Sequence, residues 1–179
     1  SLPVIAAKLG RSDDFRNAVQ NIIRVIDPAS DFCDFEGQWE RGALPNRMTN
    51  REGVNAIGAQ RLGTTVYAVN EALCQSGPPE PGGIPVVRIF PAWPRDWDAE
   101  FRLMVRGGFS VAARMTAGEI PDVEIATVEK QADSELRLRN PWPGKTVTIE
   151  RSQGGSEACE GDLLVVPMNQ DETVSLRPS

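Results

Sequence analysis

The sequence FRLMVRGGFSVAARM, residues 101–115, decides the fold of this chain. In its first half Phe101, Leu103 and Val105 form one apolar row, and the residues between them belong to the opposite face. The second half repeats this alternation, and an apolar side chain at every second position predicts a β-strand. Gly107 and Gly108 separate the halves and tolerate positive φ. Because no helix follows them, they indicate a tight turn or bulge and not a phosphate-binding loop.

Similar strand-like segments continue on both sides of this stretch. Turn signals separate them, among them Gly residues at 118, 144 and 161. Short strands at this spacing, with no helix between them, predict an antiparallel β-sandwich over residues 85–179. The eight predicted strands are residues 86–90, 101–106, 109–115, 123–128, 135–139, 146–150, 163–166 and 173–176.

The first part of the chain has helical patterning. One predicted helix ends near Leu9, with Gly10 as its C-terminal glycine. Ser12 is a suitable N-cap for a second helix, with Asp13 and Asp14 in its first turn. A third helix is predicted for residues 53–75, with apolar side chains along one face. Three such helices cannot readily bury all their apolar faces against one another, so residues 1–76 are interpreted as the end of an α/α barrel or a similar helical array.

A stretch rich in proline and glycine, SGPPEPGG at residues 76–83, lies between these parts and predicts a linker or an ordered surface loop. The predicted fold class is therefore α+β: helices over residues 1–76, a linker at 77–84, and an eight-stranded antiparallel sandwich. The sequence starts at Ser1 and enters helical sequence almost at once, which favours a portion of a longer protein. No signal peptide pattern is visible, so a periplasmic or secreted location is expected only if the full-length protein carries one.

The composition excludes several kinds of chemistry. The 179 residues carry a net charge of −6, which argues against nucleic acid and membrane surfaces as partners. The chain has no histidine, so Ser–His and Cys–His nucleophile pairs and imidazole metal sites are excluded. Its cysteines, Cys33, Cys74 and Cys159, have no CxxC spacing and indicate core thiols and not a zinc site or disulfide framework. No metal and no cofactor is expected.

Several motifs resemble the C-terminal β-domain of glycoside hydrolase family 95, the α-L-fucosidase and α-L-galactosidase family. They are VRIFPAWPRDWD at residues 87–98, FRL at 101–103, RGGF at 106–109, VEI at 123–125 and LRLRNPWPG at 136–144. Upstream, GALPN at 42–46 and AVNEALCQS at 68–76 look like the last barrel loop and the last barrel helix. The resemblance covers nearly the whole chain, as the final part of such an enzyme.

This resemblance implies an enzyme with an N-terminal β-domain, an (α/α)6 barrel that carries the active site, and a C-terminal sandwich. Such enzymes hydrolyse terminal L-fucosyl or related bonds with inversion, which needs a carboxylic acid and a group that activates water. By resemblance the acid is a Glu upstream of this sequence. The Asp that activates water corresponds to Gln60 here, and an amide cannot take that proton at neutral pH. The base therefore does not carry over.

The irregular segment of residues 27–52 holds the first group of candidate site residues. Carboxylates that could act in catalysis, Glu36 and Glu40, alternate with Asp34 and Trp39 as candidate substrate-binding residues. Carboxylates beside aromatic rings suit a sugar site, because the acids bind hydroxyl groups and the rings stack on the C–H face. The alternative is a solvated acidic loop that its aromatic residues anchor.

A second polar group precedes the third predicted helix. Glu52 is the carboxylate nearest to the expected catalytic position, and Asn55 is a possible sugar ligand. The alternative is an ordinary helix N-terminus, with Glu52 in the first turn. Trp93, Trp97 and Trp142 could form a carbohydrate platform, but the pattern around Trp93 favours packing between sheet and helices.

The sequence thus predicts the C-terminal portion of a glycoside hydrolase similar to family 95, structural and not catalytic by itself. Its expected partners are the upstream helical barrel domain and, through the full enzyme, a fucosylated or related glycan. The alternative is a stand-alone carbohydrate-binding or interaction module without enzymatic activity. An inactive remnant of such an enzyme is a third possibility, because of Gln60.

Overall fold

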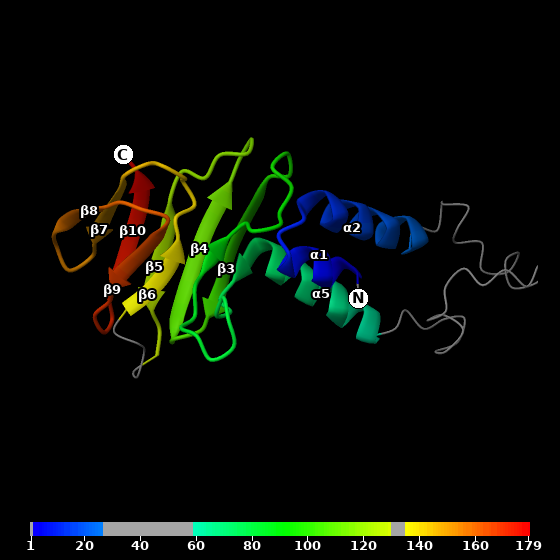
Figure 1. Cartoon of the computed structure of the whole chain (residues 1–179), viewed down its shortest axis with the longest axis horizontal. Coiled ribbons are helices and arrows are strands. Elements are labelled where there is room, and N and C mark those ends of the chain that lie inside the picture. The colour runs from blue at the N-terminus through cyan, green and yellow to red at the C-terminus, as the bar shows by residue number, and fades with distance from the viewer. Residues whose placement is uncertain (1, 27–58, 130–134) are drawn as a thin grey trace, which may run out of the picture.

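The computed structural model describes residues 2–26, 59–129 and 135–179 and shows an α+β fold (Figure 1). Three helices, α1 (Leu2–Lys8), α2 (Ser12–Ile26) and α5 (Ala59–Leu73), lie at one end of a set of antiparallel strands (Figure 1). The predicted α+β class is confirmed, because the described residues form helices and a multi-stranded antiparallel sheet; the eight-stranded sandwich and the barrel origin of the helices stay predictions. None of the helices described is long and apolar enough to span a lipid bilayer.

The turn between α1 and α2 follows from Gly10. Its φ is +69°, its N–H donates to the carbonyl of Ala7 at 3.1 Å, and the N–H of Arg11 donates to the carbonyl of Ala6 at 2.9 Å. These two bonds are those of a Schellman motif, which satisfies carbonyls that a helix end leaves free. The prediction that Gly10 ends the first helix is confirmed.

The helices form a small core of their own. α1 packs against both α2 and α5, and small residues allow the close approach: Ala6 and Ala7 of α1 and Ala68 and Ala72 of α5 are all buried. Phe15 of α2 fills the remaining space and is fully buried. Helices with alanine at their contacts lie near one another, so a few short elements can exclude water.

Ten strands occur in the described part of the chain. They are β1 (Cys74–Gln75), β2 (Arg88–Ile89), β3 (Ala99–Val105), β4 (Phe109–Met115), β5 (Val123–Thr127), β6 (Glu135–Arg139), β7 (Val147–Arg151), β8 (Ser156–Cys159), β9 (Leu163–Pro167) and β10 (Thr173–Pro178). The main sheet has six antiparallel strands in the order β3-β4-β5-β10-β7-β8, and two small sheets pair β1 with β2 and β6 with β9.

One hydrophobic cluster joins the main sheet to the small sheets. It includes Val111, Ile125 and Leu176 from the main sheet and Leu138 and Leu164 from the β6–β9 pair. The backbone of residue 87 connects β2 to β6, because its N–H donates to the carbonyl of residue 137 and its carbonyl accepts from residue 139, both at 2.8 Å. The small sheets and the main sheet therefore share one core.

Two of the strands in the described part of the chain, β1 and β8, are not predicted from the sequence. β1 continues directly from α5, where residues 74 and 75 had been assigned to the third helix. β8 had not been predicted, because it is an edge strand whose Ser156, Glu157 and Ala158 are all exposed and give no alternating apolar signal. The eight strands that were predicted are all present, most with shifted ends, and the segment at 86–90 is reduced to the two residues of β2.

The Pro- and Gly-rich stretch forms the loop between β1 and β2. The two strands pair with Cys74 opposite Ile89 and Gln75 opposite Arg88, and the predicted linker at 77–84 lies inside the loop that joins them. A hydrogen bond from the N–H of Val86 to the carbonyl of Gly77, at 3.3 Å, closes the loop at its base. At the β3–β4 turn both glycines, 107 and 108, have positive φ, as the sequence predicts.

Candidate functional site

The segment from Phe90 to Trp97 joins the helices to the sheets. The N–H of Phe90 donates to the carbonyl of Leu73 at 2.7 Å, and the N–H of Ala92 donates to the carbonyl of Ala72 at 3.3 Å. These are terminal carbonyls of α5, which would otherwise lack partners. Phe90 holds a φ of +49°, a conformation that costs a non-glycine residue about 1 kcal/mol. The packing around it therefore fixes the direction of the chain here.

Aromatic side chains of this segment pack on α2. The Trp93 ring lies 5.9 Å from that of Phe15 and 5.6 Å from that of Trp97, and its indole N–H donates to the carbonyl of Trp97 at 2.9 Å. Arg16 lies over the Trp97 ring and forms an ion pair with Asp96. The interpretation of Trp93 and Trp97 as packing residues is confirmed.

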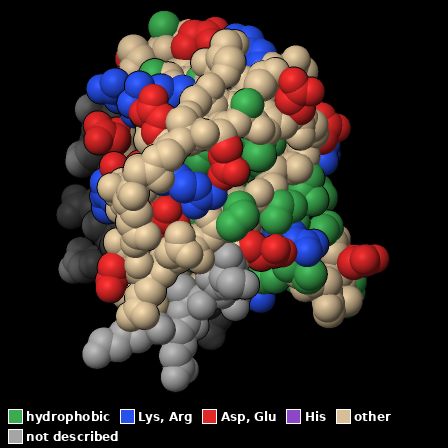
Figure 2. Space-filling view, turned by 90° about the vertical axis from the view of Figure 1, so that its left-hand side faces the viewer, with side chains coloured by type: hydrophobic (Ala, Val, Ile, Leu, Met, Phe, Trp, Pro, Cys, Tyr) green, Lys and Arg blue, Asp and Glu red, His purple; other side chains and the backbone are tan. Residues whose placement is uncertain are grey.

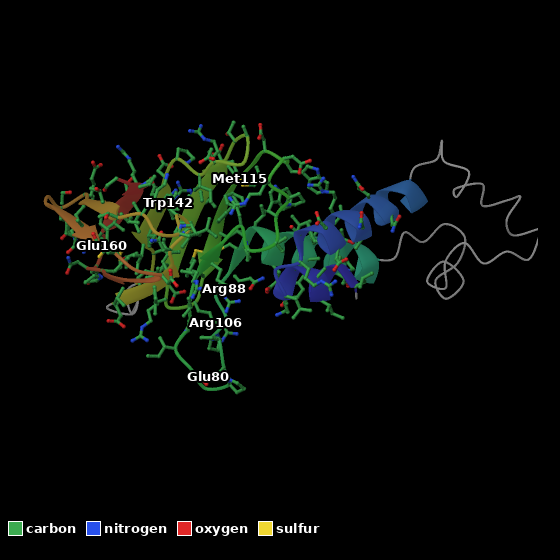
Figure 3. The ribbon with its side chains drawn as sticks, turned by 45° about the horizontal axis from the view of Figure 1, so that its top comes forward. Glu80, Arg88, Arg106, Met115, Trp142 and Glu160 are labelled. Carbon is green, nitrogen blue, oxygen red and sulfur yellow. The ribbon has the colours of Figure 1, made fainter. Side chains whose placement is uncertain are left out.

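A groove of about 340 Å³ lies on the surface where α1 and α5 meet the β1–β2 loop and the end of β3. Figure 3 shows two of its residues, Arg88 and Arg106, near the base of the loop that carries Glu80. Elements far apart in the sequence meet here. The lining residues are Lys8, Tyr67, Glu71, Gln75, Ser76, Gly77, Pro78, Pro79, Arg88 and Arg106.

Three of the four charged residues in the groove are basic. Lys8 and Glu71 form an ion pair, with Nζ of the lysine 3.7 Å from Oε2 of the glutamate. The same ammonium lies 5.5 Å from the centre of the Tyr67 ring. A hydrogen bond with the Tyr67 side chain and the nearby Glu71 carboxylate raise the pKa of Lys8, although partial burial opposes them. Lys8 therefore stays charged and is already engaged by protein groups.

Arg88 and Arg106 differ from Lys8, because neither guanidinium has an ion-pair partner among the residues that the structure describes. The backbone of Arg106 is held, because its N–H donates to the hydroxyl of Ser76 at 3.3 Å, but no residue in the described ranges holds its guanidinium. Most arginines of the sheets are paired with carboxylates, as Arg102 is with Glu124 at 2.8 Å. The two guanidinium groups in the groove are thus available to a ligand.

Buried residues below the groove hold its walls in place. The side-chain amide of Gln75 donates to the carbonyls of Ala7 at 2.8 Å and of Glu71 at 3.0 Å, which ties α1 and α5 to β1. Burial, and to a lesser extent the Glu71 carboxylate, raise the pKa of the Cys74 thiol to about 12. The thiol is therefore protonated and unreactive at neutral pH.

The candidate residues predicted from the sequence lie outside the described residues. They are Asp34, Glu36, Trp39, Glu40, Glu52 and Asn55. Gln60 belongs to the first turn of α5. In the ranges 2–26, 59–129 and 135–179, no group of three or more acidic or cysteine side chains is arranged to hold a metal ion.

Two residues of the motif at 136–144, Asn140 and Trp142, have side chains that hold the fold together. Asn140 is buried, its amide donates to the carbonyls of Lys145 at 3.2 Å and Gly161 at 2.9 Å, and its oxygen accepts from the N–H of Trp142 at 2.9 Å. The Trp142 indole donates to the carbonyl of Ile120 at 2.7 Å and lies within the fold (Figure 3). Asn140 and Trp142 are therefore structural residues.

One acidic residue is buried in the turn between β9 and β10. Glu172 is 1% exposed, and its carboxylate accepts bonds from Arg151 at 3.2 Å and from the backbone of Asn169 at 2.8 Å. Hydrogen bonding to Glu157, and then to Glu172, raises the pKa of Arg151 against the effect of burial. The bonds to Glu172 hold the turn between β9 and β10 to the end of β7, so this buried ion pair has a structural role.

Comparison with known proteins gives no match: no protein-family model and no curated protein sequence matches the chain.

The groove was not predicted, because its basic residues lie in three separate parts of the sequence and share no spacing.

Proposed function

We propose that the chain is the C-terminal portion of a glycoside hydrolase similar to family 95, with a structural and not a catalytic role. In this proposal the helices are the last part of an (α/α)6 barrel, and the sheets are the eight-stranded sandwich of its C-terminal domain with two short additions. The full enzyme would hydrolyse terminal α-L-fucosyl or related bonds with inversion.

The observation that carries the proposal is the apolar outer face of α1. Leu2, Ile5 and the adjoining Leu9 are 66%, 54% and 65% exposed, and their spacing places them on one side of the helix. Val66 of α5 is likewise 59% exposed. Large side chains at helical spacing are typical of a face that packs against further helices.

The sheet end of the molecule has a different character. Figure 2 shows this end, where acidic and basic side chains are interspersed and the hydrophobic ones gather toward one side. The junction of residues 90–97 supports the same division of roles, because it caps α5 and packs on α2 while the outer face of α1 is left uncovered. The sheets would thus stabilise the last barrel helices from one side only.

The test compares the intact gene product with the chain alone. Release of fucose from an aryl α-L-fucoside is expected from the intact protein and not from the chain. Ile5→Glu together with Leu9→Glu is expected to lower the melting temperature of the intact protein by several degrees, because burying each side chain contributes about 1.5–3 kcal/mol. The same changes should leave the isolated chain almost unaffected.

Met104→Glu is the matched control, since Met104 is an equally exposed residue (60%) on β3 of the main sheet. It should have little effect on either protein. Turnover by the chain alone, or equal effects of the α1 and Met104 variants on the intact protein, would contradict the proposal.

The alternative is a stand-alone carbohydrate-binding or interaction module without enzymatic activity. The groove beside Tyr67 favours it, because an exposed ring next to hydrogen-bonding groups suits a sugar. Saturable binding of a fucosylated oligosaccharide to the chain, together with an intact product that lacks an upstream barrel, would establish this alternative.

A further inference from the structure

We propose that the groove between α1, α5 and the β1–β2 loop binds a small organic carboxylate on a polar body, of which a uronic acid is the simplest probe. The proposal is independent of the proposed function, because binding to this groove requires no upstream barrel and no turnover.

Charge is the first argument. The groove has three cations and one anion, and the single carboxylate, Glu71, is already paired with Lys8. The guanidinium groups of Arg88 and Arg106 therefore provide the uncompensated positive charge. A guanidinium binds a carboxylate through two parallel N–H bonds, and such charge-assisted bonds are about twice as strong as neutral ones. A local positive site on a chain of net charge −6 is selective for an anion.

Shape is the second argument. A volume of about 340 Å³ falls at the lower end of the range for small-molecule sites. Tyr67, which is 45% exposed, and the rings of Pro78 and Pro79 form apolar walls beside the charged residues. Ser76 adds a hydroxyl-bearing residue to the lining. A ligand with a carboxylate at one end and a compact body with C–H and hydroxyl groups matches this lining.

Preorganisation is the third argument. Arg88 lies on β2 directly opposite Gln75, whose side chain is anchored to α1 and α5. Arg106 begins the β3–β4 turn, and the bond from its N–H to Ser76 fixes it relative to the loop. Because the backbones of both arginines are fixed, a ligand orders only their side chains, which lowers the entropic cost of binding.

A second groove with basic residues is less suitable. It lies beside Trp142 and contains Arg95 and Lys145, but the Arg95 guanidinium already donates to the carbonyl of Gly118 at 3.2 Å. In the groove between α1, α5 and the β1–β2 loop, the guanidinium groups of Arg88 and Arg106 have no such partner in the described part of the chain.

The experiment is calorimetric titration of the chain with glucuronate at low ionic strength, with glucose and inorganic sulfate as comparison probes. Glucuronate should bind saturably and glucose should not, since it lacks the carboxylate. Arg88→Gln and Arg106→Gln should each weaken glucuronate binding about tenfold, which corresponds to the loss of one charge-assisted hydrogen-bonding group. Arg88→Lys should have an intermediate effect, because the charge remains and the planar fork is lost.

Arg114→Gln is the matched control. Arg114 is exposed on β4, outside the groove, and the substitution makes the same change in net charge. It should leave the affinity unchanged, and Tyr67→Leu should weaken glucuronate more than sulfate. Circular dichroism and the melting temperature establish that each variant is folded.

Four results would overturn the proposal. They are no binding of glucuronate at millimolar concentration, equal binding of glucose, equal weakening by Arg114→Gln and the groove variants, and binding of sulfate as tight as that of glucuronate. The third result would indicate unspecific electrostatic attraction, and the fourth would exclude recognition of an organic body.

Discussion

At the scale of single residues, Asn140 shows how one side chain organises a loop. It makes three hydrogen bonds to backbone groups in a buried position. Asn140→Asp keeps the size of the side chain but replaces a double donor by a carboxylate, which would face two carbonyl oxygens. We expect a loss of about 2–4 kcal/mol in the free energy of unfolding, measured by urea denaturation.

The control for this change is Asn17→Asp, because Asn17 is exposed on α2. It should alter the free energy of unfolding by no more than about 0.5 kcal/mol. A similar small effect of Asn140→Asp would show that the loop does not depend on these bonds.

The buried thiol of Cys74 gives the fold a dependence on alkaline pH. Its pKa is raised to about 12, so between pH 9 and 12 the unfolded chain loses the thiol proton while the folded chain keeps it. The folded state then binds more protons, and its stability falls as the pH rises. From pH 8.5 to 10.5 the wild type should lose about 2 kcal/mol more than Cys74→Ala does.

The measurement is urea denaturation of both proteins at the two pH values. Cys159→Ala is the control, because Cys159 is only half-buried at the end of β8, and this variant should follow the wild type. Equal losses in the wild type and in Cys74→Ala would contradict the expectation.

At the scale of elements, glycines at two positions have opposite consequences. Gly10 has a φ of +69°, and a Cβ there would lie 3.2 Å from the carbonyl oxygen of Pro91. Gly10→Ala should therefore destabilise the fold by about 1–2 kcal/mol, since both the backbone and the contact oppose a side chain. Gly63 lies inside α5, and a Cβ there would meet nothing within 4 Å.

Gly63→Ala is thus the matched variant and should stabilise the chain by up to about 1 kcal/mol through helix propensity. Thermal denaturation of both variants measures the two changes in stability. No effect of Gly10→Ala would show that the turn between α1 and α2 does not constrain the packing. Destabilisation by Gly63→Ala would contradict the open space at that position of α5.

The elements also show what sequence patterns can predict. β3, β4 and β6 follow from their alternation, and the start of α2 follows from Ser12, because these signals are local. The short strand β1 could not be predicted, since its pairing with β2 depends on residues beyond the intervening loop. The exposed edge strand β8 offers no apolar pattern at all.

At the scale of the whole molecule, the candidate site is the least predictable feature. Lys8, Tyr67, Arg88 and Arg106 come from four elements or turns, and only the packing of the helices on the sheets brings them together. A sequence motif consists of residues that are close along the chain. Such a motif contains Asn140 and Trp142, but none contains the residues of this groove together. The carboxylates and Asn55 that the sequence favours instead remain predictions, because they lie outside the described residues.

The continuity of α5 with β1 has a consequence for limited proteolysis. The exposed loop near Glu80 and Pro81 is a natural cleavage point, and it lies where the sequence predicts a linker. The new ends, however, would belong to paired strands, and the bonds from Phe90 and Ala92 to the end of α5 cross between the two pieces. A nicked chain should give two bands on a denaturing gel and still elute as a single species on size exclusion, with the second piece acting as a tightly bound subunit of the first.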